Sequence, residues 1–324
     1  MKAIQCVQWG TPDQLRLVEL ADPAPGAGEV RVRVRAAGVN FPDALIVQKK
    51  YQVQPPLPFV PGTEVAGEID AVGDGVTDLK VGQRVAGYVG LGGFAERVCV
   101  DARRTVPLPS GVDDTVAAGF TLTYATAQHA LIHRARLEAG ETLLVLGAAG
   151  GVGLAAVELG KLAGARVIAA ASTDEKLAAC RAAGADVLVN YSSLELREAV
   201  KACTSGKGVD VVYDPVGGAY TEPALRSIAW GGRLLVIGFA NGEIPRIPAN
   251  LLLLKEVAAI GVFWGEFARR DPQGNTRMIG ELMTWLAQGT LKPTVSKVYP
   301  LADAPQALAD LLHRRAVGKL VIRP

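Results

Sequence analysis

A glycine-rich segment in the middle of the chain, LLVLGAAGGVG at residues 143–153, constrains the fold more than any other stretch. Its branched apolar start is typical of a buried parallel strand, and the alanine-rich residues after it are typical of a helix ending near Leu162. Glycines at a strand-to-helix turn permit positive φ, close approach of a ligand to the backbone, and tight packing of helix on strand.

The first N–H groups of such a helix face an anion, so the segment predicts a dinucleotide-binding turn. A similar turn also occurs in α/β domains that bind no nucleotide, so the segments that follow the turn must distinguish the two alternatives. The residues expected to contact the cofactor here are Gly147, Ala148, Gly150, Gly151, Val152 and Gly153.

Strand and helix patterns alternate regularly after this turn. Strands are expected at 166–171, 187–190, 209–213, 233–238 and 257–262, and helices at 174–183, 194–203 and 220–228. This alternation predicts βαβ units in a doubly wound parallel sheet. Ligands of such sheets bind at the carboxyl ends of the strands, and the glycine turn is expected there.

The N-terminal third predicts a different architecture. The segment Glu29–Arg35 alternates valine with arginine, which is typical of a strand with one buried face and one solvated arginine face. Short strands at 2–9, 15–20, 65–72, 84–89 and 94–100 predict a small barrel or sandwich. A long helix is expected within 112–134, bridging two domains. The expected domains are 1–122 with 265–324, and 123–264.

Composition excludes several classes of protein. With 49% hydrophobic and 20% charged residues in 324, the chain is not of the disordered type. A net charge of +2 gives no electrostatic case for nucleic acid or an acidic membrane. Charged residues among the first 20 interrupt any apolar signal core, so a cytoplasmic location is expected.

Histidines and cysteines do not predict a metal centre. The four cysteines form no CxxC pair, which favours reduced thiols. His129 and His133 are spaced for one helical face, but no third ligand is near them in the sequence. We expect these two histidines to have a surface or capping role.

Five motifs occur in order along the chain: GVNFPD (38–43), PGTEVAG (61–67), LKVGQRV (79–85), GETLLVLGAAGGVG (140–153) and GKLVI (318–322). With them the chain resembles the zinc-independent quinone oxidoreductase branch of the medium-chain dehydrogenase/reductase superfamily, which includes zeta-crystallin. The resemblance implies a Rossmann sheet joined to a GroES-like β-barrel domain, with NADPH as cofactor and a homodimer as the assembly. Glu158 departs from the family signature, which usually has glutamine there.

Zinc-dependent relatives place a cysteine and a histidine where this chain has Asn40 and Thr63. Neither an amide nor a hydroxyl is a credible zinc ligand, so the resemblance also implies no metal.

The residues after the second strand bear on the choice between NADPH and NADH. That strand ends in Ser172 and Thr173, with no carboxylate before Asp174. A hydroxyl and a cation suit a 2′-phosphate. The resemblance assigns this task to Ser172, Lys176 and Tyr191, with Arg315 as a further candidate. Taken singly, the lysine could be a solvated helix residue and the tyrosine a packed strand end.

The resemblance further implies that aromatic residues flank the nicotinamide and that Thr126 approaches its carboxamide. The aromatic candidates are Phe239, Phe263 and Trp264, for which ordinary core packing is the alternative.

Polar candidates for binding a hydride acceptor are Asn40, Asp43 and Tyr51. Helix capping is the alternative for Asn40 and Asp43, and a loop aromatic is the alternative for Tyr51. We expect reduction of a small-molecule quinone. Reduction of activated C=C bonds in enones, enals or enoyl thioesters is the alternative activity. A third hypothesis is that the chain is a non-catalytic NADPH-binding protein.

Overall fold

The computed structural model describes all 324 residues, which divide into two compact units. The β-rich unit comprises residues 1–122 and 279–324, and the parallel-sheet unit comprises residues 123–278. The second boundary lies inside helix α10 (Pro272–Ala287), later than the position after Trp264 that we expected. Trp264 Nε1 donates to Asn275 Oδ1 at 2.8 Å, a contact that ties the start of α10 to the parallel-sheet unit.

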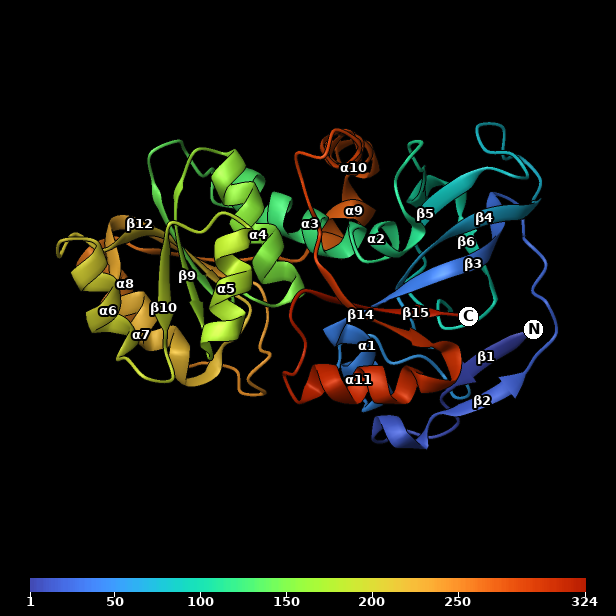
Figure 1. Cartoon of the computed structure of the whole chain (residues 1–324), viewed down its shortest axis with the longest axis horizontal. Coiled ribbons are helices and arrows are strands. Elements are labelled where there is room, and N and C mark those ends of the chain that lie inside the picture. Colours follow the sequence, from blue (N-terminus) through green and yellow to red (C-terminus); the bar gives the residue numbers. More distant parts are fainter. The chain divides into compact units, whose positions relative to one another are not determined.

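Six parallel strands form the sheet of the parallel-sheet unit, and the predicted doubly wound fold is confirmed. Their order is that of a Rossmann fold: the strand that comes first in the sequence lies at the centre, and later strands are added first on one side of it and then on the other. The order is β10 (Val187–Asn190), β9 (Arg166–Ala171), β8 (Thr142–Leu146), β11 (Val209–Asp214), β12 (Ile228–Val236) and β13 (Ala258–Gly261). Helices α4 and α5 pack on β8, β9 and β10, and α7 packs on β11 and β12 (Figure 1).

The helices that connect these strands begin and end near the expected residues. They are α4 (Gly151–Leu162), α5 (Asp174–Ala182), α6 (Leu196–Cys203) and α7 (Thr221–Arg226), with the single turn η4 (Gly218–Tyr220) before α7. Two further helices that we did not expect are α8 (Ala249–Lys255) and α9 (Trp264–Arg270). No helix in the chain is both long enough and apolar enough to cross a membrane.

The long helix expected within 112–134 is interrupted. It consists of α2 (Asp114–Ala118), α3 (Thr121–Gln128) and a π-helical segment, η3 (His129–Arg134). The break falls at Gly119, where an added Cβ would lie 3.2 Å from the side chain of Lys319. A larger residue here would press on Lys319, so the absence of a side chain at Gly119 allows close packing at the break.

Seven strands form the main sheet of the β-rich unit. Its order is β14 (Val295–Pro300), β15 (Lys319–Arg323), β3 (Glu29–Val39), β4 (Glu64–Val72), β5 (Arg84–Tyr88) and β7 (Thr105–Pro107), with β6 (Arg97–Asp101) pairing β3. β1 (Lys2–Gln5) and β2 (Arg16–Glu19) pair separately. The valines of β3 are buried, as their alternation predicts, and the C-terminal strand β15 joins β3 directly. Helices α1 (Phe41–Val47) and α11 (Ala304–Leu312) pack against each other.

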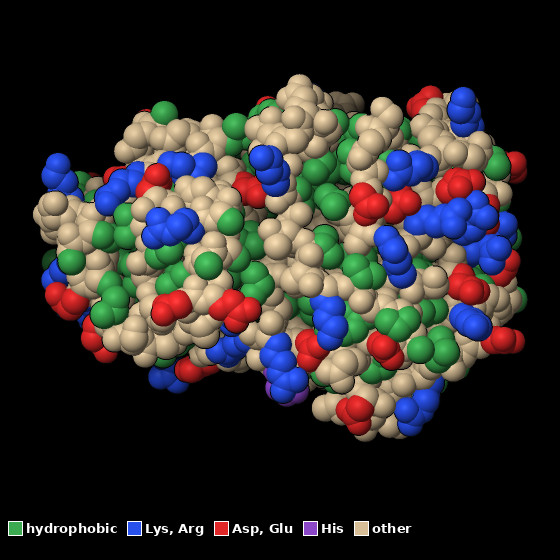
Figure 2. Space-filling model, viewed as in Figure 1, with side chains coloured by type: hydrophobic (Ala, Val, Ile, Leu, Met, Phe, Trp, Pro, Cys, Tyr) green, Lys and Arg blue, Asp and Glu red, His purple; other side chains and the backbone are tan.

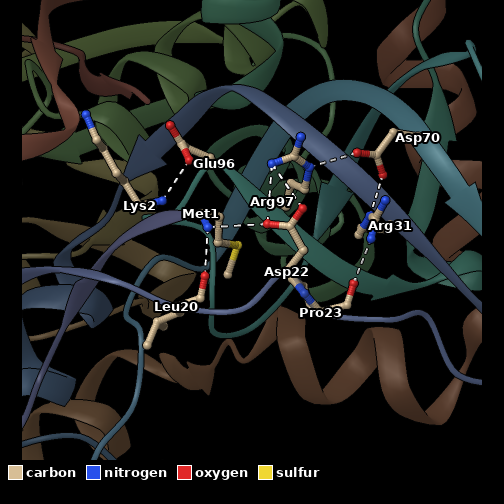
Figure 3. Close-up of polar contacts among 9 residues, drawn as sticks. All are labelled: Met1, Lys2, Leu20, Asp22, Pro23, Arg31, Asp70, Glu96 and Arg97. Carbon is tan, nitrogen blue, oxygen red and sulfur yellow. Dashed lines mark hydrogen bonds and ion pairs between the residues drawn. The ribbon is translucent and has the colours of Figure 1, made fainter.

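The arginines of β3 are less solvated than expected, because acidic side chains of β4 pair with them. Arg31 Nε lies 2.6 Å from Asp70 Oδ1, and Arg97 of β6 reaches the other oxygen of Asp70 at 3.0 Å. Figure 3 shows this network continuing through Asp22 to the amino group of Met1. One carboxylate thus joins three strands of the sheet.

Replacing Asp70 by asparagine is expected to lower the free energy of unfolding by about 1–3 kcal/mol, because two half-buried arginines lose their charge-assisted bonds. Denaturant unfolding of the two proteins measures the difference. Arg103→Gln is the control: it removes an ion pair whose arginine is 83% exposed, and solvent-exposed pairs contribute little to stability. Equal losses in the two variants would contradict a structural role for Asp70.

Candidate active site

The glycine turn lies between β8 and α4, with Gly150 as the N-cap of the helix. Gly147 has φ +55°, and a Cβ there would lie 2.8 Å from Val216. A Cβ on Gly153 would lie 2.4 Å from the carbonyl oxygen of Gly147, so only glycine lets the first helical turn pack on the loop. Gly151 and Val152 occupy the first two helical positions, and their N–H groups belong to the free amides of a helix N-terminus.

This turn also lies at the switch point of the sheet, because β8 and β11 are neighbours whose connections run to opposite sides. Asp214 at the end of β11 is a buried residue that the sequence did not single out. Its Oδ1 accepts from the N–H groups of Val216 and Gly217 at 2.8 Å, and its Oδ2 accepts from the hydroxyl of Thr221. Asp214 therefore fixes the loop whose Val216 side chain touches Gly147.

Three of the residues expected at a 2′-phosphate come together at the end of β9. Lys176 Nζ donates to Ser172 Oγ at 3.2 Å. Tyr191 follows β10, and its N–H donates to the carbonyl oxygen of Ala171 at 3.1 Å. The carboxylate of Asp174 accepts from the side-chain amide of Asn190 at 3.0 Å. A hydroxyl and an ammonium group therefore gather where an anionic phosphate would be bound, and this pair fits NADPH. The ring of Tyr191 packs on that of Tyr220, with 4.7 Å between the ring centroids, as expected of a packed strand end.

The other cofactor candidates differ in their surroundings. Trp264 is buried, with its ring N–H bonded to Asn275, so core packing accounts for it, whereas Phe263 is 55% exposed. Phe239 lies in the loop after β12, against Gly217. Thr126 is half-buried on α3. Arg315 belongs to the β-rich unit, where its guanidinium lies 3.3 Å from Asp310.

Glu158 has a definite partner in this chain. Its carboxylate accepts from the hydroxyl of Tyr124 at 3.0 Å, and this contact joins α4 to α3. Burial, with the nearby Glu158 charge, raises the pKa of Tyr124 well above its usual value, so the phenol stays neutral. Glutamate in place of glutamine therefore still provides a side-chain oxygen that accepts the hydrogen bond of Tyr124.

The acceptor candidates of the β-rich unit surround a buried polar cluster. Asn40 is the N-cap of α1, and its Nδ2 donates to Thr63 Oγ1 and to Glu64 Oε1, both at 3.0 Å. Its Oδ1 accepts from Lys319 Nζ at 2.6 Å. Both amide hydrogens are therefore engaged, and donation from Asn40 to an acceptor oxygen would have to replace one of these bonds. The sequence did not indicate Glu64 or Lys319.

Asp43 is fully buried in the same cluster and caps α1, because its Oδ2 accepts from the N–H of Asn40 at 2.8 Å. Its Oδ1 has no hydrogen-bond partner. Burial raises the pKa of Asp43 to about 7, although the N–H of Asn40 and the charge of Lys319 act to lower it. Asp43 therefore holds a proton near neutral pH and can serve in acid–base chemistry.

Two tyrosines belong to the surroundings of Asp43. Burial raises the pKa of Tyr51, and the charge of Asp43 adds to this effect. Burial also raises the pKa of Tyr88, on β5, to about 12. Both phenols remain protonated at neutral pH and are hydrogen-bond donors.

Of the two histidines of η3, His133 is exposed, as we expected, whereas His129 does not have the surface role that we expected. His129 is 6% exposed, its ring stacks on Phe267, and its Nδ1 lies 3.3 Å from His133 Nδ1. Burial, with the charges of His133 and Arg134, lowers the pKa of His129 to about 4. Nowhere in the chain do three or more His, Cys, Asp or Glu side chains gather in a metal-binding arrangement.

Two family models match the chain. The alcohol dehydrogenase GroES-like domain matches residues 26–110, and the zinc-binding dehydrogenase domain matches residues 151–281. A Nematostella vectensis protein described as quinone oxidoreductase-like protein 2 homolog is 39% identical over 99% of this chain and 88% of its own length.

Solved structures are similar over the whole chain. Mycobacterial Rv1454c complexed with NADPH has a TM-score of 0.94 at 35% identity, and Escherichia coli quinone oxidoreductase complexed with NADPH has a TM-score of 0.94 at 30% identity. Each match covers 100% of both chains. The resemblance found in the motifs is therefore confirmed, and the chain belongs to the quinone oxidoreductase family of medium-chain dehydrogenases/reductases.

Proposed function

We propose that this chain is an NADPH-dependent, zinc-free quinone oxidoreductase. The observation that carries the proposal is the contact of Lys176 with Ser172 at the sheet edge that also bears the glycine turn. An ammonium and a hydroxyl stabilise a 2′-phosphate, which NADH lacks. The two similar structures that hold NADPH support the same cofactor.

When bound, NADPH supplies a hydride from C4 of its nicotinamide. The glycine turn of the parallel-sheet unit binds the pyrophosphate, while Asn40, Asp43 and Tyr51 of the β-rich unit serve the acceptor. Tyr51 donates a hydrogen bond to the acceptor oxygen, and Asp43, with its pKa raised to about 7, keeps a proton available nearby. Reduction of a quinone to a hydroquinone consumes one hydride and one proton.

The absence of zinc from the proposed reaction rests on the groups at two positions. Asn40 and Thr63 offer an amide and a hydroxyl, and the Asn40 amide is already bonded to Glu64, Thr63 and Lys319. Turnover should therefore be unchanged after dialysis against a chelator.

NADPH carrying deuterium at the transferred C4 position tests the proposal. With a quinone, the deuterium should be lost to water from the hydroquinone hydroxyl, and the rate should show a primary isotope effect. Retention of deuterium on carbon in the product of an enone or enoyl thioester, with no quinone consumed, would replace this proposal by an alkene reductase. NADPH binding without turnover of either acceptor would leave a non-catalytic binding protein.

We propose further that the protein is a homodimer joined through β13, the edge strand of the parallel sheet. Ala258, Ala259 and Gly261 are exposed there, so the edge presents small apolar residues. An edge strand is a template for pairing with a second chain. Trp230 on the neighbouring β12 is 69% exposed, which adds apolar surface. An isologous contact through this edge would bury the exposed residues of β13 and the side chain of Trp230.

Replacing Ala259 by lysine is expected to convert the dimer to a monomer, because each new cation would face its own copy across a two-fold interface. Analytical ultracentrifugation measures the mass against the 33.9 kDa of the chain. Ala182→Lys, at an exposed position of α5, is the control and should stay dimeric. A dimer that persists in Ala259→Lys would place the interface elsewhere.

A further inference from the structure

A buried ion pair underlies the acceptor candidates of the β-rich unit. Lys319 Nζ lies 2.9 Å from Glu64 Oε1, and the two side chains are 6% and 1% exposed. The same ammonium group donates to Asn40 Oδ1 at 2.6 Å and to the carbonyl oxygen of Val39 at 3.0 Å. All three donor hydrogens of the lysine are therefore used inside the protein.

Burying such a pair is a costly way to stabilise a fold. The loss of hydration often exceeds the attraction between the charges, and apolar residues of similar volume would serve as well. The contacts of this pair therefore point to a role beyond stability. Both of its members touch the amide of Asn40, on opposite ends.

These two contacts fix the orientation of the amide. Lys319 can only donate, so it requires Oδ1 on its side, and the Glu64 carboxylate can only accept, so it requires Nδ2 on the other side. A flipped amide would set its NH₂ group against the ammonium and its oxygen against the carboxylate. The orientation in turn directs Nδ2 to Thr63 Oγ1.

The backbone around the pair is shaped to admit it. A Cβ on Gly38 would lie 2.6 Å from Glu64 Oε1, and a Cβ on Gly119 would lie 3.2–3.3 Å from three carbons of Lys319. The second oxygen of Glu64 accepts from the N–H of Leu122, in the first turn of α3, at 2.9 Å. Strands β3, β4 and β15 and the start of α3 therefore meet at one carboxylate.

We propose that Lys319 and Glu64 are positioning residues: together they hold the Asn40 amide in one orientation and thereby fix Asn40 within the acceptor site of Asn40, Asp43 and Tyr51. Neither residue is proposed to contact the substrate. This proposal rests on the proposed function, because the acceptor site that the pair fixes is part of that function.

The test is a mutant cycle between the ion pair and Asn40. In Lys319→Met/Glu64→Gln the methionine offers no donor, while the glutamine offers both a donor and an acceptor, so either amide orientation is allowed. We expect kcat/KM for a quinone to fall about tenfold and Kd for NADPH to stay within about twofold. Adding Asn40→Ala should then cost little more, since the pair acts through Asn40.

Lys2→Met, at an exposed position of the same unit, is the control for the loss of a lysine and should keep full activity. Wild-type kcat/KM in the double variant would overturn the inference. So would an Asn40→Ala penalty that is equal in the wild-type and double-variant backgrounds, because equal penalties mean that the pair and Asn40 act independently.

Hydrogen exchange of the Asn40 side-chain amide gives a readout that needs no turnover. In protein labelled with ¹⁵N-asparagine, the Asn40 signal is identified by its loss in Asn40→Ala. We expect slow exchange in the wild type and exchange at least about tenfold faster in the double variant, since a held amide opens rarely. Equal exchange rates would refute positioning, and a wild type that reduces no quinone would refute only the proposed function.

Discussion

Replacing Gly151 by aspartate is expected to raise the Kd for NADPH by at least about a hundredfold, roughly 2.7 kcal/mol. Gly151 is the first residue of α4, whose N-terminus presents free N–H groups and the positive end of the helix dipole. An aspartate there sets a negative charge and a side chain against the pyrophosphate. Because like charges at a few ångströms repel strongly in a partly buried site, most of the binding energy at the turn should be lost.

Titration of NADPH fluorescence measures this loss, and thermal unfolding without cofactor shows whether the variant is folded. Gly280→Asp makes the same change on an exposed face of α10, where an added Cβ meets nothing within 4 Å. This control should bind NADPH like the wild type. A folded Gly151→Asp protein with unchanged affinity would mean that the glycine turn does not bind the cofactor.

Replacing Lys176 by alanine is expected to narrow the preference for NADPH over NADH by about tenfold or more, the effect of losing one charge-assisted contact. Lys176 is held beside Ser172 by its bond to the hydroxyl, and Thr173 caps the helix that carries it. The comparison of kcat/KM for the two cofactors measures the change. It should come from weaker use of NADPH, with the value for NADH nearly constant.

Lys161→Ala is a matched control, since this lysine of α4 is engaged in an ion pair with Asp186. Its loss should leave the cofactor preference in place. A preference that also persists in Lys176→Ala would exclude the end of β9 as the 2′-phosphate site and would leave Arg315 as the remaining candidate.

Elements with a strong local signal could be predicted from the sequence. The run of apolar residues before Gly147 and the alternation after it led to the correct parallel sheet, because periodicity and glycine turns are properties of neighbouring residues. The capping role of Asp43 was one of two alternatives for the same reason, since a cap depends on spacing of three residues.

Features that depend on distant residues could not be predicted. Lys319 and Glu64 are separated by 255 positions, and each alone is an ordinary charged residue of a strand. The burial of His129 depends on Phe267 of α9, a helix that we did not expect. Gly119, where the long helix breaks, likewise packs on the distant Lys319. In each case the burial or pairing of the residue depends on tertiary packing, which the local sequence pattern does not specify.

The charge distribution agrees with a small-molecule enzyme more than with a binder of polyanions. Figure 2 shows lysines and arginines interspersed with acidic residues over the face in view. The net charge of the whole chain is +2.

The rate of NADPH oxidation with a panel of acceptors tests the central claim most directly. The panel holds several quinones, an enone, an enal and an enoyl thioester, each repeated with NADH. We predict that kcat/KM is highest for quinones and that NADPH is preferred for each acceptor. Faster turnover of the activated alkenes than of every quinone, or equal use of NADH, would contradict the account.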